Sequence, residues 1–186
     1  MSIYKVNKGN LLIANPEFGT EDFFAKTVIL IADHNIKGSV GFVLNRPQKF
    51  TLQDLIPEIK NKFKIYNGGP IEQESLYFLH KVPHLIANSV KICDGVYWGG
   101  DFAIIKDLLN NNEITSKDIK FFLGYTGWGV HQMEDELEEE HWILDTSTRH
   151  VDLFDTQLSN IWKNKIIEHC PEFAIWINAP INPTFN

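Results

Sequence analysis

Two consecutive apolar segments near the start of the chain constrain the fold most. Residues 27–32 are rich in β-branched side chains and apolar on both faces, which is typical of a central strand. Gly38-Ser39 then leads from a polar loop into a second apolar segment, residues 40–44. The pattern predicts two adjacent strands, and the glycine at position 41 indicates a bulge or a close backbone contact.

Further strands and helices are predicted around this pair. Alternating apolar residues predict a strand over residues 119–125, and apolar spacing predicts a helix over residues 130–137. Thr51 and Asp101 stand where the N-terminal caps of two more helices are expected, and Trp162 lies in a last amphipathic helix. The other predicted strands cover residues 11–14, 65–67, 75–80, 89–93 and 142–144. Because strands and helices do not alternate regularly, the predicted fold class is α+β, with a mixed, largely antiparallel β-sheet and several flanking helices.

Composition limits the class of protein. The chain has 186 residues, 44% of them hydrophobic and 22% charged, which excludes a disordered tail. The longest uninterrupted hydrophobic run, residues 28–32, is far shorter than the roughly 20 residues that a membrane helix needs. The N-terminus carries no apolar segment of the signal-peptide type, and two cysteines allow at most one disulfide. We therefore expect a cytoplasmic protein with no membrane association, folded as a single domain over residues 1–186.

The charge balance is acidic. Seventeen lysines and arginines stand against 24 acidic side chains, giving a formal charge of −7, and the only arginines are Arg46 and Arg149. Such a chain repels a phosphate backbone at long range, and it has no recognisable helix-turn-helix. The single basic cluster lies at residues 60–64. Direct DNA binding is therefore not expected.

Several short motifs follow one another in a particular order. They are Ala14-x-Pro16, Val28-Ile29-Leu30 followed by Asp33-His34, Gly41-x-x-x-Asn45-Arg46-Pro47, Gly68-Gly69-Pro70, Leu79-His80 and Gly124-Tyr125-x-Gly127-Trp128-Gly129-x-x-Gln132-x-Glu134-x-Glu136. In this order the chain resembles the YqgE/AlgH family over about residues 9–170, with residues 171–186 as a C-terminal tail. One departure is Val130-His131, which stands where the family usually carries Pro-Gly.

The resemblance implies a bacterial cytosolic protein with a mixed-sheet α+β fold. Some members of the family are labelled as transcriptional regulators. The family has no agreed catalytic reaction, so the resemblance supplies no mechanism.

The turn after the second apolar segment carries a candidate ligand-binding pair. Arg46 can offer a bidentate guanidinium to a carboxylate or a phosphate, with Asn45 beside it. A placed arginine in an acidic chain indicates an anion clamp. The alternative is a structural ion pair that pins the turn against a nearby acid, and the sequence leaves both open.

Two glycine-rich turns are further candidates. Gly68-Gly69 and the turn with Gly127 can let the backbone approach a ligand closely, or they can serve only as tight turns. Neither turn has the spacing of a phosphate-binding loop. Trp128 can stack on a planar ligand or fill the core, and Gln132 is a polar candidate beside it.

Asp33 and His34 are the candidates for acid–base catalysis. They can act as a general acid and base, but no nucleophile motif such as G-x-S-x-G accompanies them. His131 and Glu134 share one face of a helix, but the opposing ligands that would complete a metal site are not identifiable. No metal and no cofactor are therefore predicted, and residues 134–140 are interpreted as a solvated acidic helix face.

Three functions fit these residues. The first is an indirect transcriptional regulator or a sensor, with a polar pocket for a small anionic ligand at Arg46, the glycine turns and Gln132. The second is a hydrolase or transferase acting on an anionic small molecule, with Asp33, His34 and Arg46 in one cleft. The third is a module that binds a protein partner through Trp128 and the acidic helix. The first is the prediction we carry forward, and no catalytic reaction is assigned.

Overall fold

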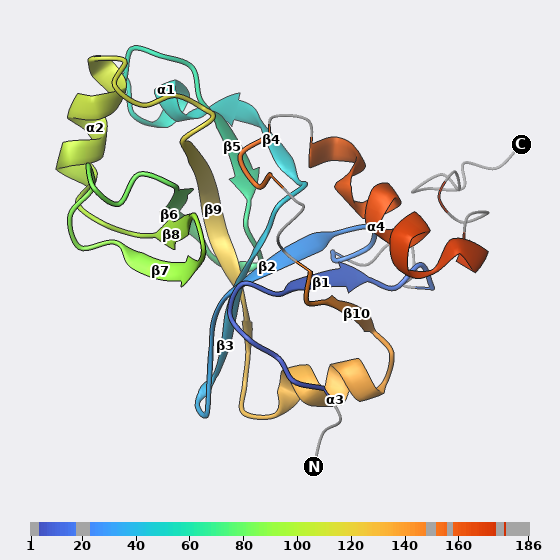
Figure 1. Cartoon of the computed structure of the whole chain (residues 1–186). Helices are drawn as coiled ribbons and strands as arrows, with labels where there is room; N and C mark the ends of the chain where they lie inside the picture. The colour runs from blue at the N-terminus through green and yellow to red at the C-terminus, as the bar shows by residue number, and fades with distance from the viewer. Residues whose placement is uncertain (1–3, 18–22, 148–151, 156–157, 174–176, 178–186) are drawn as a thin grey trace, which may run out of the picture.

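A ten-stranded sheet dominates the part of the chain that the computed structural model describes, residues 4–17, 23–147, 152–155, 158–173 and 177 (Figure 1). The strands are β1 (Leu11–Ala14), β2 (Val28–Asn35), β3 (Gly38–Val43), β4 (Pro47–Thr51), β5 (Lys64–Asn67), β6 (Ile71–His80), β7 (Val90–Cys93), β8 (Val96–Trp98), β9 (Ile119–Trp128) and β10 (Trp142–Asp145). The helices are α1 (Leu52–Leu55), α2 (Phe102–Asn110), α3 (Gln132–Glu138) and α4 (Ile161–His169), with short 3-10 segments η2 (Leu158–Asn160) and η3 (Pro171–Phe173).

The order of the strands confirms the predicted fold class. The sheet runs β10-β1-β2-β3-β9-β6-β8-β7, and β5 pairs with both β4 and β9. Within the described residues, β5 and β9 pair in parallel and the other pairs are antiparallel. The protein is therefore α+β, with a mixed and largely antiparallel sheet.

The long strand β9 runs through the middle of the molecule (Figure 1). Residues 126–128 at its end pair with β3, and residues 121–123 nearer its start pair with β5. Its other edge pairs with β6. One strand thus connects the half of the molecule that contains the β2–β3 hairpin with the half that contains α1 and α2.

Two hydrophobic cores lie on either side of this arrangement. The first includes Leu30 and Phe122 and receives the buried faces of α3 and α4. The second includes Ile105 of α2 and Phe121. Because successive side chains of a strand point to opposite faces, the neighbouring residues Phe121 and Phe122 enter different cores.

Several local features predicted from the sequence, two helix caps and a bulge, are present in the structure. Thr51 and Asp54 make the reciprocal contacts of a capping box at α1, and the Asp101 carboxylate accepts a hydrogen bond from the Ala103 backbone at 2.9 Å. Opposite Gly41 the register of β2 shifts by one residue, which confirms the bulge. The short strands β4 and β8 were not predicted.

The end of the chain is described only in part. Of the predicted tail, residues 171–186, η3 and the buried Ile177 are described, and the other positions lie outside the described residues, as does Arg149. In the described part of the chain, the helices are too short or too polar to cross a membrane.

Candidate functional site

The β2–β3 hairpin presents Asp33 and His34 close to its tip. Asn35 pairs with Gly38, which leaves a two-residue loop and sets His34 directly opposite Ser39. As a result, His34 Nδ1 lies 2.8 Å from the Ser39 hydroxyl oxygen. Asp33 Oδ2 accepts a hydrogen bond from the Asn35 side chain at 2.8 Å.

His34 also connects the hairpin to α3. Its Nε2 lies 3.6 Å from Oε1 of Glu134, in the first turn of that helix. With the ring proton on Nε2, the Ser39 hydroxyl donates to Nδ1 while the Nε2–H faces the carboxylate. Through these two contacts the imidazole ties the hairpin tip to the start of α3.

Two cavities lie on the two faces of the hairpin tip, where they share Gly38, Ser39 and Gly129, and we call them together the hairpin hollow. One has a volume of about 440 Å³ and the other about 340 Å³. Asp33 and Gly127 line the first, His34 and Glu134 line the second, and Ser39 lines both. Of the residues singled out in the sequence, the hairpin hollow therefore gathers Asp33, His34, Gly127, Trp128, His131 and Glu134.

Trp128 and Gln132 brace the corner between β9 and α3. Trp128 is buried, and its indole N–H donates to Glu136 Oε2 at 2.9 Å. The Gln132 amide donates to Glu136 Oε1 at 2.9 Å and accepts from the Gly129 backbone at 2.9 Å. These contacts favour the core-filling alternative for Trp128 and a bracing role for Gln132.

Asn45 and Arg46 lie at the opposite end of the same hairpin. Asn45 Oδ1 accepts from the backbone of Val28, which is five residues before Asp33 on β2 and hence roughly 16 Å away along the strand. The structure therefore does not place Arg46 in one cleft with Asp33 and His34, as the hydrolase hypothesis requires.

The Arg46 guanidinium contacts backbone carbonyls. Its Nη2 donates to the carbonyl oxygens of Phe23, at 3.1 Å, and Ala25, at 2.6 Å, and burial lowers its pKa. These contacts favour a structural role, but the bonded groups are carbonyls rather than the acid that the structural alternative supposed. Arg46 holds the segment before β2 against the turn after β3.

The Gly68-Gly69 turn packs against the protein's own backbone. A Cβ atom on Gly68 would lie 2.2 Å from the carbonyl oxygen of Gly124, and one on Gly69 would lie 2.1 Å from the carbonyl carbon of Tyr125. These approaches are possible only without side chains. They favour the tight-turn alternative, because the close backbone partner is β9.

The acidic helix α3 presents one of its carboxylates, that of Glu134, to the hairpin. Glu134 faces His34, and among the described residues no group of three or more His, Cys, Asp or Glu side chains is placed to hold a metal ion. Residues 138–140 are exposed.

Comparison of this sequence with known families gives a match over nearly the whole described chain, residues 11–173, to the AlgH-like family. The chain belongs to the AlgH-like family. A UPF0301 protein of Chlorobium limicola is 35% identical to it over 183 residues, which cover 98% of this chain and 97% of that protein. A UPF0301 protein of Cytophaga hutchinsonii is 34% identical, covering 97% of this chain and 100% of its own. The predicted resemblance is confirmed.

Solved structures show the same AlgH-like fold. The crystal structure of a Corynebacterium diphtheriae protein matches with a TM-score of 0.73 at 20% identity, covering 96% of this chain and 95% of that one. The solution structure of the AlgH protein from Pseudomonas aeruginosa matches with a TM-score of 0.71 at 21% identity, covering 96% and 98%. These likenesses concern the fold.

In this AlgH-like chain, His131 occupies a backbone position that suits glycine. It precedes α3 with φ 63°, in the left-handed region that costs a residue with a Cβ atom free energy. We expect His131→Gly to raise the free energy of unfolding by about 0.5–1 kcal/mol, measured by urea denaturation. His131→Ala, which keeps a Cβ, should give no such gain, and equal stability of the two variants would contradict the strain.

Sequence reasoning missed two residues of this AlgH-like protein and the role of a third. Ser39 was not singled out, although the short loop ending in Gly38 could have indicated that it lies opposite His34. Glu134 was considered as a metal ligand, and no local signal pairs it with His34. Lys120 was not considered, although a lysine inside the apolar strand β9 is itself a signal.

Proposed function

We propose that this AlgH-like protein is a regulatory protein that senses a small polar ligand in the hairpin hollow. The supporting observation is the position of His34, whose two ring nitrogens face Ser39 on β3 and Glu134 on α3. A ligand that replaces either contact changes how the hairpin is held against α3, and this change is the signal. The acidic charge of the chain favours an effect passed to a protein partner rather than through contact with DNA.

The side chains of the hollow favour a ligand that donates hydrogen bonds. Asp33 and Glu134 supply carboxylates and Ser39 supplies a hydroxyl, whereas Lys37 is the one lysine among the described lining residues. The anionic ligand predicted at Arg46 gains no support here, because that guanidinium binds backbone carbonyls at the other end of the hairpin. An amine- or amide-bearing small molecule matches the hollow better.

A thermal-shift screen tests this function. We expect amine- and amide-bearing metabolites to include a compound that, at about 100 times its Kd, stabilises the protein by about 2.7 kcal/mol, a shift of several degrees. The shift in melting temperature should be lost in His34→Gln and Glu134→Gln, because each variant removes one partner of the His34–Glu134 contact. Nuclear magnetic resonance of labelled amides in β3 and α3 would locate the binding.

Glu138→Gln is the matched control, since it removes the same charge from an exposed position on the same helix. It should keep the full shift. Unchanged melting across amine-bearing and phosphorylated libraries, or equal shifts in all three variants, would count against the hairpin hollow as a sensor.

A further inference from the structure

A further cavity lies beside the beginning of β9, apart from the hairpin hollow. Its volume is about 170 Å³, and its lining includes the rings of Phe63, Tyr66 and Phe154. Three lysines also line it: Lys62, Lys64 at the start of β5, and Lys120 on β9. The cavity therefore combines aromatic side chains with three lysines and one carboxylate, that of Asp155.

Lys120 is the residue of this cavity that the fold does not account for. Its side chain is 6% exposed, and its Nζ is covered and has no hydrogen-bond acceptor in the described part of the chain. The nitrogen lies 3.9 Å from the centroid of the Tyr66 ring. A cation–π contact compensates only part of the free energy of burying an ammonium group, so an anion beside Lys120 would complete its environment.

The surroundings of Lys120 bring the pKa of its amine close to neutral pH. Burial lowers the pKa of Lys120 to about 7, Asp155 and Asp152 act in the opposite direction, and Lys64 on β5 lowers the pKa further. A bound anion would favour the protonated amine.

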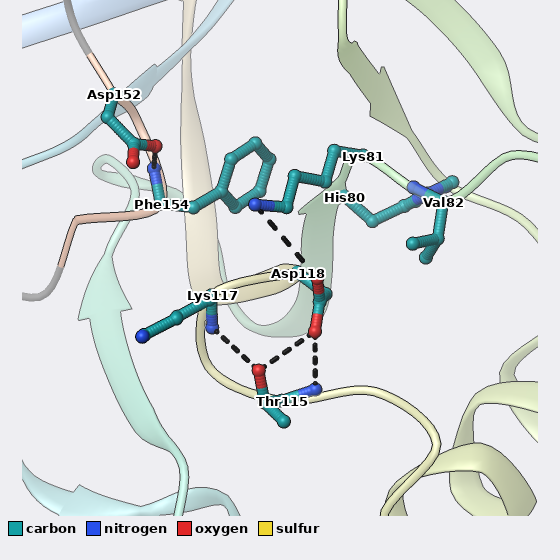
Figure 2. Close-up of polar contacts among 8 residues, drawn as sticks. All are labelled: His80, Lys81, Val82, Thr115, Lys117, Asp118, Asp152 and Phe154. Atoms are coloured by element: carbon teal, nitrogen blue, oxygen red, sulfur yellow. Dashed lines mark hydrogen bonds and ion pairs between the residues drawn. The ribbon is translucent and has the colours of Figure 1, made fainter.

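The Phe154 wall of the cavity is fixed by contacts outside it. Figure 2 shows Lys81 extending between Asp118 and the Phe154 ring, with its Nζ 4.0 Å from Asp118 Oδ1 and 5.7 Å from the ring centroid. Asp118 accepts hydrogen bonds from the Thr115 backbone and hydroxyl, and Asp152 accepts one from the Phe154 backbone. Lys81 thus lies between Asp118 and the Phe154 ring and does not line the cavity.

We propose that this cavity binds a small monocarboxylate with an aromatic or short aliphatic body. A cavity of about 150 Å³ is enough to hold benzene, so a ring of that size fits here among the three aromatic side chains. The rotatable stem of Lys120 lets its Nζ turn from Tyr66 to the carboxylate, and Lys64 adds positive potential. Asp155 also lines the cavity, and its charge disfavours a dianion such as phosphate.

Benzoate is the probe, titrated into the full chain by calorimetry with ligand-observed nuclear magnetic resonance. We expect wild type to bind it, and Lys120→Met to bind roughly tenfold more weakly or less, because the charge-assisted contact is lost. Lys120→Arg, which keeps the cation, should retain binding. Affinity for wild type should fall as the pH rises from about 6 to about 9, since the amine loses its proton.

Lys117→Met is the matched control. Lys117 is exposed and precedes the same strand, and it does not line the cavity, so benzoate affinity should stay unchanged. Absence of benzoate binding to wild type, equal affinity in Lys120→Met, or an equal loss in Lys117→Met would each overturn the proposal. Phosphate binding more tightly than benzoate would overturn the assigned ligand class. The hairpin-hollow proposal is tested separately, because His34→Gln and Glu134→Gln leave this cavity intact.

Discussion

Replacing Glu136 by alanine is expected to remove about 3–5 kcal/mol from the free energy of unfolding. The Glu136 carboxylate accepts the indole N–H groups of Trp128, at 2.9 Å, and Trp142, at 2.7 Å, on the same oxygen. Both tryptophans are buried, so the alanine variant removes the carboxylate that accepts from two buried indole N–H groups, at about 1–3 kcal/mol each. Urea denaturation followed by tryptophan fluorescence measures the loss.

The comparison for Glu136→Ala is Glu138→Ala. Glu138 lies on the same helix and is exposed, so this change should stay within about 0.5 kcal/mol of wild type. Glu136→Gln keeps one carbonyl oxygen and should fall between the two. Similar stability of the Glu136 and Glu138 alanine variants would show that the indole groups have other acceptors.

The buried Asp145–Lys165 pair is expected to make the protein sensitive to acid. Lys165 Nζ lies 2.7 Å from Asp145 Oδ2, and the two side chains are 5% and 0% exposed. Burial alone would raise the pKa of Asp145, but donation by Lys165 and by Ser147 lowers it to about 2. The group binds its proton less readily in the folded state, so its contribution is present above about pH 4 and is lost as the pH falls towards 2. That contribution is about 2 kcal/mol.

Asp145→Asn should lower the free energy of unfolding by more than protonation of Asp145 does. The change leaves the buried Lys165 ammonium with the half-exposed Glu168 carboxylate, 2.9 Å away, as its remaining partner, and we expect a loss of about 3 kcal/mol at neutral pH. The variant should also lose the corresponding part of the acid dependence, measured by urea denaturation at a series of pH values between about 2 and 7. Replacing both partners, Asp145→Leu with Lys165→Met, should recover much of the loss. A double variant no more stable than Asp145→Asn would contradict a charge-based origin.

The sheet and helices were largely predictable because their signals are local. Continuous apolar segments predicted β2 and β3, and caps at Thr51 and Asp101 predicted the starts of α1 and α2. β8 is short, and β4 contains a proline and polar residues, so neither has a period that separates it from a loop.

Individual residues of the candidate site could be predicted, but their proximity in space could not. The motif order singled out Asp33, His34 and Trp128, but their meeting at one hollow depends on the pairing of β3 with β9, which no local pattern specifies. The role of Arg46 could not be predicted, because its acceptors are carbonyl oxygens of a segment without regular structure. Lys120 alternates with Phe121 and would face solvent on a half-buried sheet, whereas β9 is covered on both faces.

The position of β9 limits how this protein can be divided. Its adjacent phenylalanines belong to different cores, and its two ends carry the hairpin hollow and the Lys120 cavity. A fragment that stops before residue 119 would leave the edges of β3 and β6 that pair with β9 without a partner strand. A fragment that begins after residue 128 would contain none of these three strands. Split-protein sensors or circular permutants of this chain should therefore be opened in the loops at the rim, with this strand left whole.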